Sequence, residues 1–370
     1  MSSARRVLKH DERVAWLRLS RTETIGPTTF AALLNRFPDI REALDAAPRM
    51  ARRGGGELKV PTASDAGREL EKLASLGGRM IASIEPTFPA ALAALDPPPP
   101  LISVLGDPAL LARDMVAMVG ARNASALGIK FARNIANDLG AAGLVVVSGL
   151  ARGIDQAAHT GSLETGTVAV VAGGADVVYP PENRALYDSI RERGLIVAEM
   201  PLGLPPLPRH FPRRNRIISG LARGTVVIEA AERSGSLITA NYALEQGREV
   251  FAVPGSPLDP RAKGTNRLIR EGATLTENAE DELTVLRPIL ATGFEEQENE
   301  APAASTGVIT ESEVDRTRHI IEEMLSPSPV EVDELIRQCG LPAAIVLTAL
   351  LELELGGRAL RHSGNRVSWR

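Results

Sequence analysis

Residues 116–148 read VAMVGARNASALGIKFARNIANDLGAAGLVVVS, and this stretch decides the fold class. Two apolar runs, residues 116–120 and 144–148, flank a segment whose apolar side chains recur at helical spacing over residues 129–139. Strands without a polar side are typical of a parallel sheet that helices cover on both faces. The stretch therefore predicts a strand–helix–strand unit of the α/β class.

The same alternation continues toward the C-terminus. Further strands are expected at residues 168–172, 195–200, 225–230 and 249–254, with helices between them at residues 183–193 and 237–246. The pattern predicts an extended Rossmann-like, doubly wound and mostly parallel sheet within residues 81–290. Ligands of such sheets bind at the carboxyl ends of the strands. We therefore look for function in the loops that leave those ends.

The two ends of the chain have a different pattern. Residues 1–80 predict a small helical module of the SAM or helix-hairpin kind, with a hairpin turn at Ile25-Gly26-Pro27 and a softer boundary at Gly54-Gly55-Gly56. Residues 291–312 resemble a flexible linker. Residues 313–370 predict three helices and a strand pair, the order of a winged helix. Its third helix, residues 342–353, contains no Lys, Arg, Asn or Gln, so protein contact is favoured over reading of a DNA groove.

The composition limits the function. The 370-residue chain has a net charge of −4, so any nucleic-acid site must concentrate its positive charge locally. A single cysteine, Cys339, excludes an internal disulfide framework and a multi-cysteine zinc site. No apolar run of the sequence approaches the roughly 20 residues of a membrane span. We expect no secretory signal, because no apolar stretch follows the basic residues 1–11. We expect a cytoplasmic protein without a membrane segment, metal or cofactor.

Two of the expected strands end in glycine and a basic residue before a helix begins. Gly120 and Arg122 follow the first strand, and Ser148-Gly149, Arg152 and Gly153 follow the second. Glycine lets the backbone approach a phosphate, the helix N-terminus offers N–H groups, and arginine adds a forked donor. An ordinary strand-to-helix turn with a surface arginine would look the same, so both interpretations stay open here.

A third loop carries most of the positive charge. Residues 201–224 contain five arginines and no acidic residue. A phenylalanine beside arginines can stack on an unpaired base while the arginines bind the neighbouring phosphates. The competing interpretation places the Phe211 ring in the hydrophobic core. The residues expected to contact DNA here are Arg209, Phe211, Arg213, Arg214, Asn215 and Arg216.

A fourth loop, Ser234-Gly235-Ser236, starts a helix and is a further candidate for phosphate contact, although simple N-capping explains it as well. Ser148, Asp155 and His159 could be taken for a hydrolase triad. A nucleophile elbow requires Gly-x-Ser-x-Gly, and Val146 stands where the first glycine would be. Asp155 and His159 lie four residues apart on one helical face, which favours a structural pair. We predict no catalytic residue.

Together these motifs resemble the DprA/Smf family of DNA-processing proteins. The resemblance covers the whole middle segment and rests on these motifs, in this order: Gly120-Ala-Arg122, Ser148-Gly-Leu-Ala-Arg-Gly-Ile-Asp155, Gly173-Gly174, Tyr179-Pro180 with Asn183, Phe211-Pro-Arg-Arg-Asn-Arg216, Ser234-Gly-Ser236 and Val253-Pro254-Gly255. It implies a homodimer that binds single-stranded DNA with little sequence preference and helps to load the RecA recombinase during natural transformation, without established catalysis. It also implies that Arg122, Arg152 and residues 209–216 line the DNA pocket.

Three other functions fit the residues less well. A nucleotide-processing hydrolase of the phosphoribohydrolase kind would carry Pro-Gly-Gly-x-Gly-Thr, and Gly173-Gly174-Ala175-Asp176 matches only its first half. A dehydrogenase would open its first helix with Gly-x-Gly-x-x-Gly, which residues 120–128 do not supply. A purely structural adaptor would leave the acid-free arginine stretch unexplained.

Overall fold

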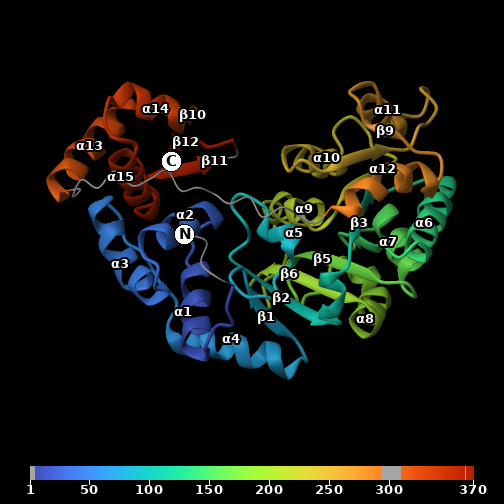
Figure 1. The fold of residues 1–370 in the computed structure, drawn as a ribbon, viewed down its shortest axis with the longest axis horizontal. Helices are drawn as coiled ribbons and strands as arrows, with labels where there is room; N and C mark the ends of the chain where they lie inside the picture. Colours follow the sequence, from blue (N-terminus) through green and yellow to red (C-terminus); the bar gives the residue numbers. More distant parts are fainter. Residues whose placement is uncertain (1–4, 293–309, 363) are drawn as a thin grey trace. The chain divides into compact units, whose positions relative to one another are not determined.

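The computed structural model describes residues 5–292, 310–362 and 364–370 (Figure 1). The chain forms two compact units, one from residues 69–297 and one that combines residues 1–68 with residues 298–370. Most of the linker expected at residues 291–312 lies outside the described residues. Domain boundaries at residues 80, 290 and 312 remain a prediction; the contacts add that the two terminal segments share one compact unit.

The larger unit is built on the expected sheet. Its nine strands lie in the order β1-β2-β6-β5-β4-β3-β7-β8-β9. All pairs from β6 to β9 are parallel, whereas β2 pairs antiparallel with β1 and β6. This confirms the doubly wound, mostly parallel prediction and adds β1, β2 and β9. The strands are β1 (Arg79–Ala82), β2 (Leu101–Gly106), β3 (Met115–Gly120), β4 (Val145–Ser148), β5 (Thr167–Gly174), β6 (Leu195–Met200), β7 (Gly224–Ile228), β8 (Glu249–Ala252) and β9 (Thr274–Leu275).

Helices cover both faces of this sheet, because the strands send apolar side chains to both. In β3, Ala117 and Val119 pack in one core with α5, α9, α10 and α11, whereas Val116 and Met118 pack in the other with α6, α7 and α12. The helices of this unit are α5 (Ala90–Ala93), α6 (Ala126–Ala141), α7 (Ile154–Ser162), α8 (Arg184–Arg193), α9 (His210–Leu221), α10 (Gly235–Glu245), α11 (Lys263–Arg270) and α12 (Ala279–Ala291). The helix α4 (Ala63–Ser75) begins in the smaller unit and ends in this one.

Strand order reverses at β3. The chain continues from β3 to β4, β5 and β6 on one side and returns to β7, β8 and β9 on the other. The loops after β3, β4 and β5 therefore leave the same edge of the sheet as those after β7 and β8. Two neighbouring sites for ligands are available there.

The smaller unit contains the two terminal modules. α1 (His10–Ser20), α2 (Pro27–Arg36) and α3 (Ile40–Arg53) come from the N-terminal segment. The winged helix is confirmed, with α13 (Glu311–Met324), β10 (Val330–Glu331), α14 (Val332–Cys339), α15 (Ala343–Leu355), β11 (Ala359–His362) and β12 (Arg366–Trp369). As expected, Gly26 precedes α2 and Pro27 occupies its first turn.

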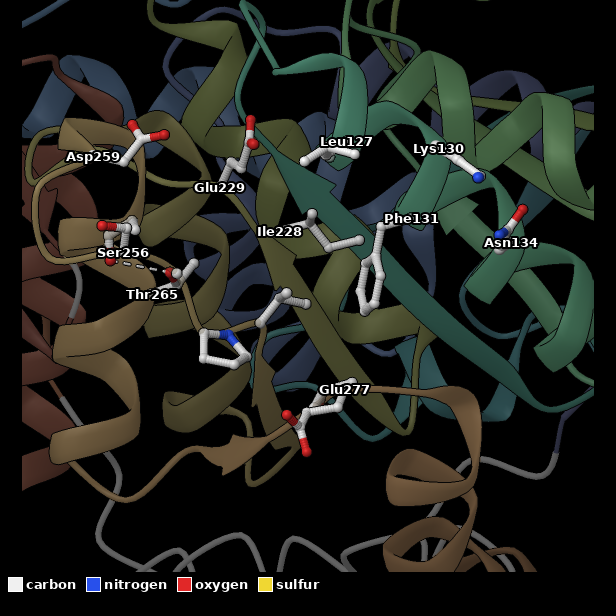
Figure 2. Close-up of a pocket in the computed structure, with 16 residues that line it drawn as sticks. Leu127, Lys130, Phe131, Asn134, Ile228, Glu229, Ser256, Asp259, Thr265 and Glu277 are labelled. Carbon is white, nitrogen blue, oxygen red and sulfur yellow. Dashed lines mark hydrogen bonds between the residues drawn. The ribbon is translucent and has the colours of Figure 1, made fainter.

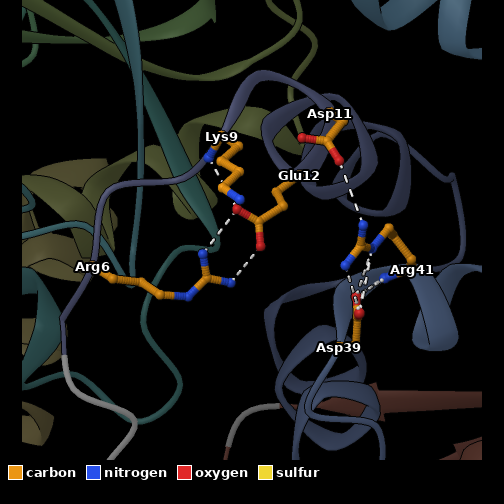
Figure 3. A network of polar contacts seen from close by, with 6 residues as sticks. All are labelled: Arg6, Lys9, Asp11, Glu12, Asp39 and Arg41. Carbon is orange, nitrogen blue, oxygen red and sulfur yellow. Dashed lines mark hydrogen bonds and ion pairs between the residues drawn. The ribbon is translucent and has the colours of Figure 1, made fainter.

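Polar contacts order the start of the chain (Figure 3). Arg6 donates two hydrogen bonds to the Glu12 carboxylate, at 2.8 and 2.7 Å, and the Lys9 backbone N–H donates a third at 2.9 Å. These bonds, the one from Arg6 first, lower the pKa of Glu12 to about 2. Arg41 at the start of α3 pairs with Asp39 and reaches Asp11 of α1. The contacts hold the first residues and α3 against α1.

The third helix of the winged helix, α15, packs against α3. A Cβ atom at Gly54 would lie 1.8 Å from the Glu352 carbonyl oxygen, and one at Gly56 would lie 2.0 Å from that of Gly356. Glu352 is buried in this contact and accepts hydrogen bonds from Arg53 Nε at 2.7 Å and Arg318 Nη1 at 2.8 Å. Gly54-Gly55-Gly56 is thus a site of close backbone approach and not the boundary that its composition suggested.

We expect Gly54→Ala to lower the free energy of unfolding of the smaller unit by about 1–3 kcal/mol, because its methyl group must push α3 away from α15. Gly67→Ala in α4 is the matched control: a Cβ atom there meets nothing within 4 Å, so stability should stay equal or rise by about 0.4–1 kcal/mol. Urea unfolding followed by circular dichroism measures both. Equal stabilities for the two variants would contradict the close contact.

A buried acid in α12 generates a second prediction. Glu282 is 0% exposed, and neither carboxylate oxygen has a hydrogen-bond partner among the residues that the structure describes. Burial raises its pKa well above the ordinary value of 4.5. The folded protein then holds this proton more tightly than the unfolded chain does. Its contribution to stability is present below pH 4.5 and is lost, by up to about 1.4 kcal/mol per pH unit, as the pH rises toward the folded pKa.

Glu282→Gln should therefore flatten the dependence of unfolding free energy on pH above 4.5. Glu280→Gln, an exposed change on the same helix, should leave that slope unchanged. Denaturant titrations at a series of pH values give both slopes. A slope that is the same in wild type and Glu282→Gln would show that Glu282 is ionised in the folded protein.

Candidate nucleic-acid interface

The loops after β3, β4 and β5, with the start of α9, enclose a cavity of about 190 Å³. Of the residues predicted from the sequence, five line it: Arg122, Gly149, Arg152, Phe211 and Arg214. Tyr179 also lines it and was absent from the predicted site. The parallel sheet brings these residues together because all three strands end at the same edge.

A buried guanidinium forms one wall of this cavity. Arg214 lies against Gly149, where a Cβ atom would be 1.7 Å from its Nη1. That nitrogen donates a hydrogen bond to the Val170 carbonyl oxygen at 2.8 Å. Burial lowers the pKa of Arg214 to about 10, and the nearby Asp155 charge acts in the opposite direction. Arg214 is therefore still positive at neutral pH.

Aromatic and cationic side chains meet beside this wall. The Phe211 ring is half-buried, with the Arg122 guanidinium 5.4 Å and the Arg214 guanidinium 5.9 Å from its centroid. The Tyr179 ring meets it edge-on, at 5.9 Å and 61°. Phe211 thus packs among charged groups at the cavity, and it is missing from the apolar cores of the sheet.

The loop that carries Arg152 is held by buried polar groups. The Asp155 carboxylate accepts hydrogen bonds from the backbone N–H groups of Gly149 at 3.2 Å and Ala151 at 3.3 Å. The Asn183 amide donates to the carbonyl oxygens of Leu150 at 2.9 Å and Ala151 at 3.3 Å. These bonds offset the left-handed backbone of Leu150, at φ 56°. The loop is rigid and leaves Arg152 exposed.

The three residues of the hydrolase alternative do not meet. Ser148 Oγ donates to the Met118 carbonyl oxygen at 2.6 Å, Asp155 binds the loop just described, and His159 Nδ1 pairs with Thr167 Oγ1 at 2.7 Å. Burial, with Arg214 second, lowers the pKa of His159 to about 3, so its imidazole is neutral. Burial raises the pKa of Asp155. Asp155 and His159 thus have separate hydrogen-bond partners, as expected for residues outside a triad.

The arginine stretch is less open than its sequence suggests. Arg209 and Arg213 are exposed, but Arg214 and Asn215 are buried in α9. Arg216 pairs with Glu199 of β6, and Arg223 donates to Asp114 at 2.9 Å. Glu199 lies just before the acid-free stretch and Asp114 comes from a distant part of the chain, so neither carboxylate is found within residues 201–224.

The remaining predicted residues lie outside the cavity lining. Gly120 and Gly153 allow close packing, since Cβ atoms there would lie 1.9 Å from the Ile228 carbonyl oxygen and 2.3 Å from that of Ala121. Ser234 caps α10 by accepting a hydrogen bond from Ser236 N–H at 3.3 Å, and Asn215 donates to the Gly235 carbonyl oxygen at 3.3 Å. The capping interpretation accounts for these contacts.

The N-terminus of α6, expected to offer N–H groups to a phosphate, already holds a carboxylate. Ser125 donates to Glu229 from its backbone N–H at 2.8 Å and from its hydroxyl. Gly128 must lack a side chain here, since a Cβ atom would lie 2.7 Å from the same carboxylate. Glu229 is held at φ 52° to make this contact. An internal anion thus fills the position where strand order reverses.

Beyond Glu229, at the carboxyl ends of β7 and β8, lies a larger cavity of about 520 Å³ (Figure 2). Its walls combine apolar side chains such as Leu127 and Phe131 with the carboxylates of Glu229, Asp259 and Glu277. Among the described residues that line this larger cavity, Lys130 is the single basic one. This wall disfavours phosphate, whereas Arg122, Arg152 and Arg214 favour it in the smaller cavity.

Comparison with known proteins covers nearly the whole chain. Residues 79–287 match the family described as DNA recombination-mediator protein A, residues 10–71 match the DprA-like N-terminal HHH domain, and residues 300–365 match the DprA winged helix domain. The chain is 31% identical to protein Smf of Synechocystis over 400 residues, which cover 98% of this chain and 100% of that protein.

Two solved structures share the fold. The X-ray structure of DNA processing protein A from Streptococcus pneumoniae has a TM-score of 0.63 at 32% identity, covering 75% of this chain and 98% of that one. DNA processing protein A from Helicobacter pylori, whose structure describes a single-stranded DNA binding mode, has a TM-score of 0.53 at 27% identity, covering 57% and 96%.

The role of Asn183 in holding the Arg152 loop gives a direct prediction. Asn183→Ala removes the donor for the buried Leu150 carbonyl oxygen and the part-buried Ala151 carbonyl oxygen, which should cost about 1–3 kcal/mol of unfolding free energy. Asn137→Ala, an exposed change in α6, should have an effect within about 0.5 kcal/mol. Chemical denaturation of both variants measures this. Unchanged stability of Asn183→Ala would mean that the loop is held by other contacts.

Proposed function

This chain belongs to the family of DNA recombination-mediator protein A, and from that membership we propose that it binds single-stranded DNA at the cavity beside Arg122, Arg152 and Phe211. One observation carries the proposal: two exposed arginines, Arg122 and Arg152, line the same cavity as the aromatic rings of Tyr179 and Phe211. Guanidinium groups bind phosphates, and an aromatic ring stacks an unpaired base. Duplex DNA keeps its bases paired and offers none to the rings. Stacking accepts every base, so little sequence preference is expected.

Exposed Arg209, at the N-cap of α9, would extend the phosphate path away from the cavity, together with exposed Arg213, whose Nη2 also lies 3.8 Å from Glu199. We further propose that the protein protects single-stranded DNA and helps to load RecA onto it during natural transformation. It would do so in the cytoplasm, as a homodimer. The description of the family as a recombination mediator supports the recombinase role. Within the described residues, every helix is too short or too polar to cross a membrane.

The winged helix contributes little to DNA binding in this proposal. α15 is buried against α3, and its Thr348 and Glu354 accept hydrogen bonds from Arg36 at 2.8 Å and Thr29 at 3.0 Å. The wing arginines also have partners: Arg358 lies 4.7 Å from the Trp369 ring centroid, and Arg361 pairs with Glu354 at 2.7 Å. A role in protein contact, as its sequence indicates, fits these contacts.

The alternative, a nucleotide-processing hydrolase, has less support. Glu229 fills the N-terminus of α6, where a nucleotide phosphate would bind, and Ser148, Asp155 and His159 have separate structural partners. We therefore propose a binding protein without catalysis. Incubation with nucleoside mono- and diphosphates, followed by chromatography of the products, tests this. Turnover that Arg152→Ala abolishes would favour the hydrolase.

Salt-dependent binding to a single-stranded oligonucleotide tests the DNA proposal. Arg152→Ala should weaken binding and reduce the slope of log affinity against log salt by about 0.7, because one phosphate contact is lost. Arg152 is a cleaner choice than Arg122, whose guanidinium also covers Phe211. The control is Arg133→Ala, an exposed arginine of α6 outside the cavity lining, which should leave the slope unchanged. Equal affinity of the wild type for single strands and duplex at physiological salt would contradict the cavity site.

A further inference from the structure

Phe211 and Tyr179 present their rings differently. Phe211 is half-buried, and two guanidinium groups lie within 6 Å of its ring centroid, Arg122 at 5.4 Å and Arg214 at 5.9 Å. Tyr179 is 47% exposed and contacts Phe211 edge-on. A base that stacks on Phe211 would compete with a guanidinium, whereas the Tyr179 ring retains open surface at the same cavity.

The position of Tyr179 is constrained by its neighbours. It precedes Pro180 and Pro181, and proline restricts both its own backbone and that of the residue before it. Two residues further on, buried Asn183 is hydrogen-bonded to the loop that carries Arg152. Tyr179 and Arg152 are therefore attached to the same rigid support, which suits a ring that receives a base beside a phosphate-binding arginine.

We propose that Tyr179 is the platform on which an unpaired base stacks, and that Phe211 supports it from the side. Phe211 orients the Tyr179 ring through the edge-on contact and holds the Arg122 guanidinium over its own ring, near the path of the phosphates. The edge-to-face contact between Tyr179 and Phe211 and the cation–π contact between Arg122 and Phe211 favour one relative orientation of these three side chains. The inference rests on the proposed function and adds a DNA-contacting residue to it.

Affinity for an oligothymidylate, and for the same strand with abasic positions, tests the platform. Tyr179→Ala should weaken binding to the intact strand by roughly five-fold to more than a hundred-fold, the range for loss of one base–aromatic stack. The abasic strand should bind wild type and Tyr179→Ala equally. Tyr179→Phe keeps the ring and should bind as wild type does. The control is Tyr242→Ala, a half-buried tyrosine of α10 outside the cavity lining, which should have no effect.

Tyr179→Trp gives an independent readout. The two natural tryptophans, Trp16 and Trp369, belong to the other compact unit, so a change in fluorescence upon DNA addition reports on position 179. Stacking predicts quenching by the intact strand and none by a fully abasic strand. Thermal unfolding of each variant confirms that it is folded.

The outcomes separate the two proposals. If wild type fails to bind single strands at any salt concentration, the proposed function itself is wrong. If wild type binds and Arg152→Ala flattens the salt slope, but Tyr179→Ala binds both strands as wild type does, the platform alone is overturned. A loss in Tyr179→Phe as large as that in Tyr179→Ala would also overturn stacking, because it would assign the effect to the hydroxyl group.

Discussion

The candidate interface depends on one buried cation. The Arg214 guanidinium extends from α9 to the carboxyl ends of β4 and β5, where it lies on Gly149 and donates to Val170. A buried charge is stable only when it is paired and hydrogen-bonded. Asp155 stabilises this cation through its nearby charge, and it also accepts hydrogen bonds from the backbone of the Arg152 loop. The helix, the two strands and the loop are thereby held in one arrangement.

The sheet offers two cavities, and charge distinguishes them. Near β7 and β8, Glu229 caps α6 and shares the wall with Asp259 and Glu277. Near β4 and β5, three arginines and two aromatic rings contribute to the lining, together with Glu182. A Rossmann-like sheet usually binds a nucleotide where strand order reverses. Here an internal carboxylate fills that position, and the neighbouring cavity has the chemistry for a polyanion with exposed bases.

The terminal segments illustrate how packing changes the role of a motif. The winged helix has the strand and helix order of a DNA reader, yet α15 is buried against α3 through Gly54 and Gly56. Its acidic residues also have partners within the unit: Glu352 binds Arg53 and Arg318, and Glu354 binds Arg361. Most side chains of α15 are thus committed to contacts inside this unit, whereas Leu347 is 42% exposed.

The sequence by itself determined six strands of the sheet, its doubly wound and mostly parallel class, and the winged helix, because continuous apolar runs and helical periodicity are local properties. The strands β1, β2 and β9 came only from the structure. It also identified Arg122 and Arg152, since glycine and basic residues follow their strands directly, and Phe211, since arginines surround it in a stretch without acidic residues. Only the tertiary structure decided which groups are free. Glu199 pairs with Arg216, Asp114 with Arg223 and Glu229 with Ser125, and Tyr179 meets Phe211. Such contacts join residues far apart in the chain, and their energies depend on distance in space, which a linear pattern does not contain.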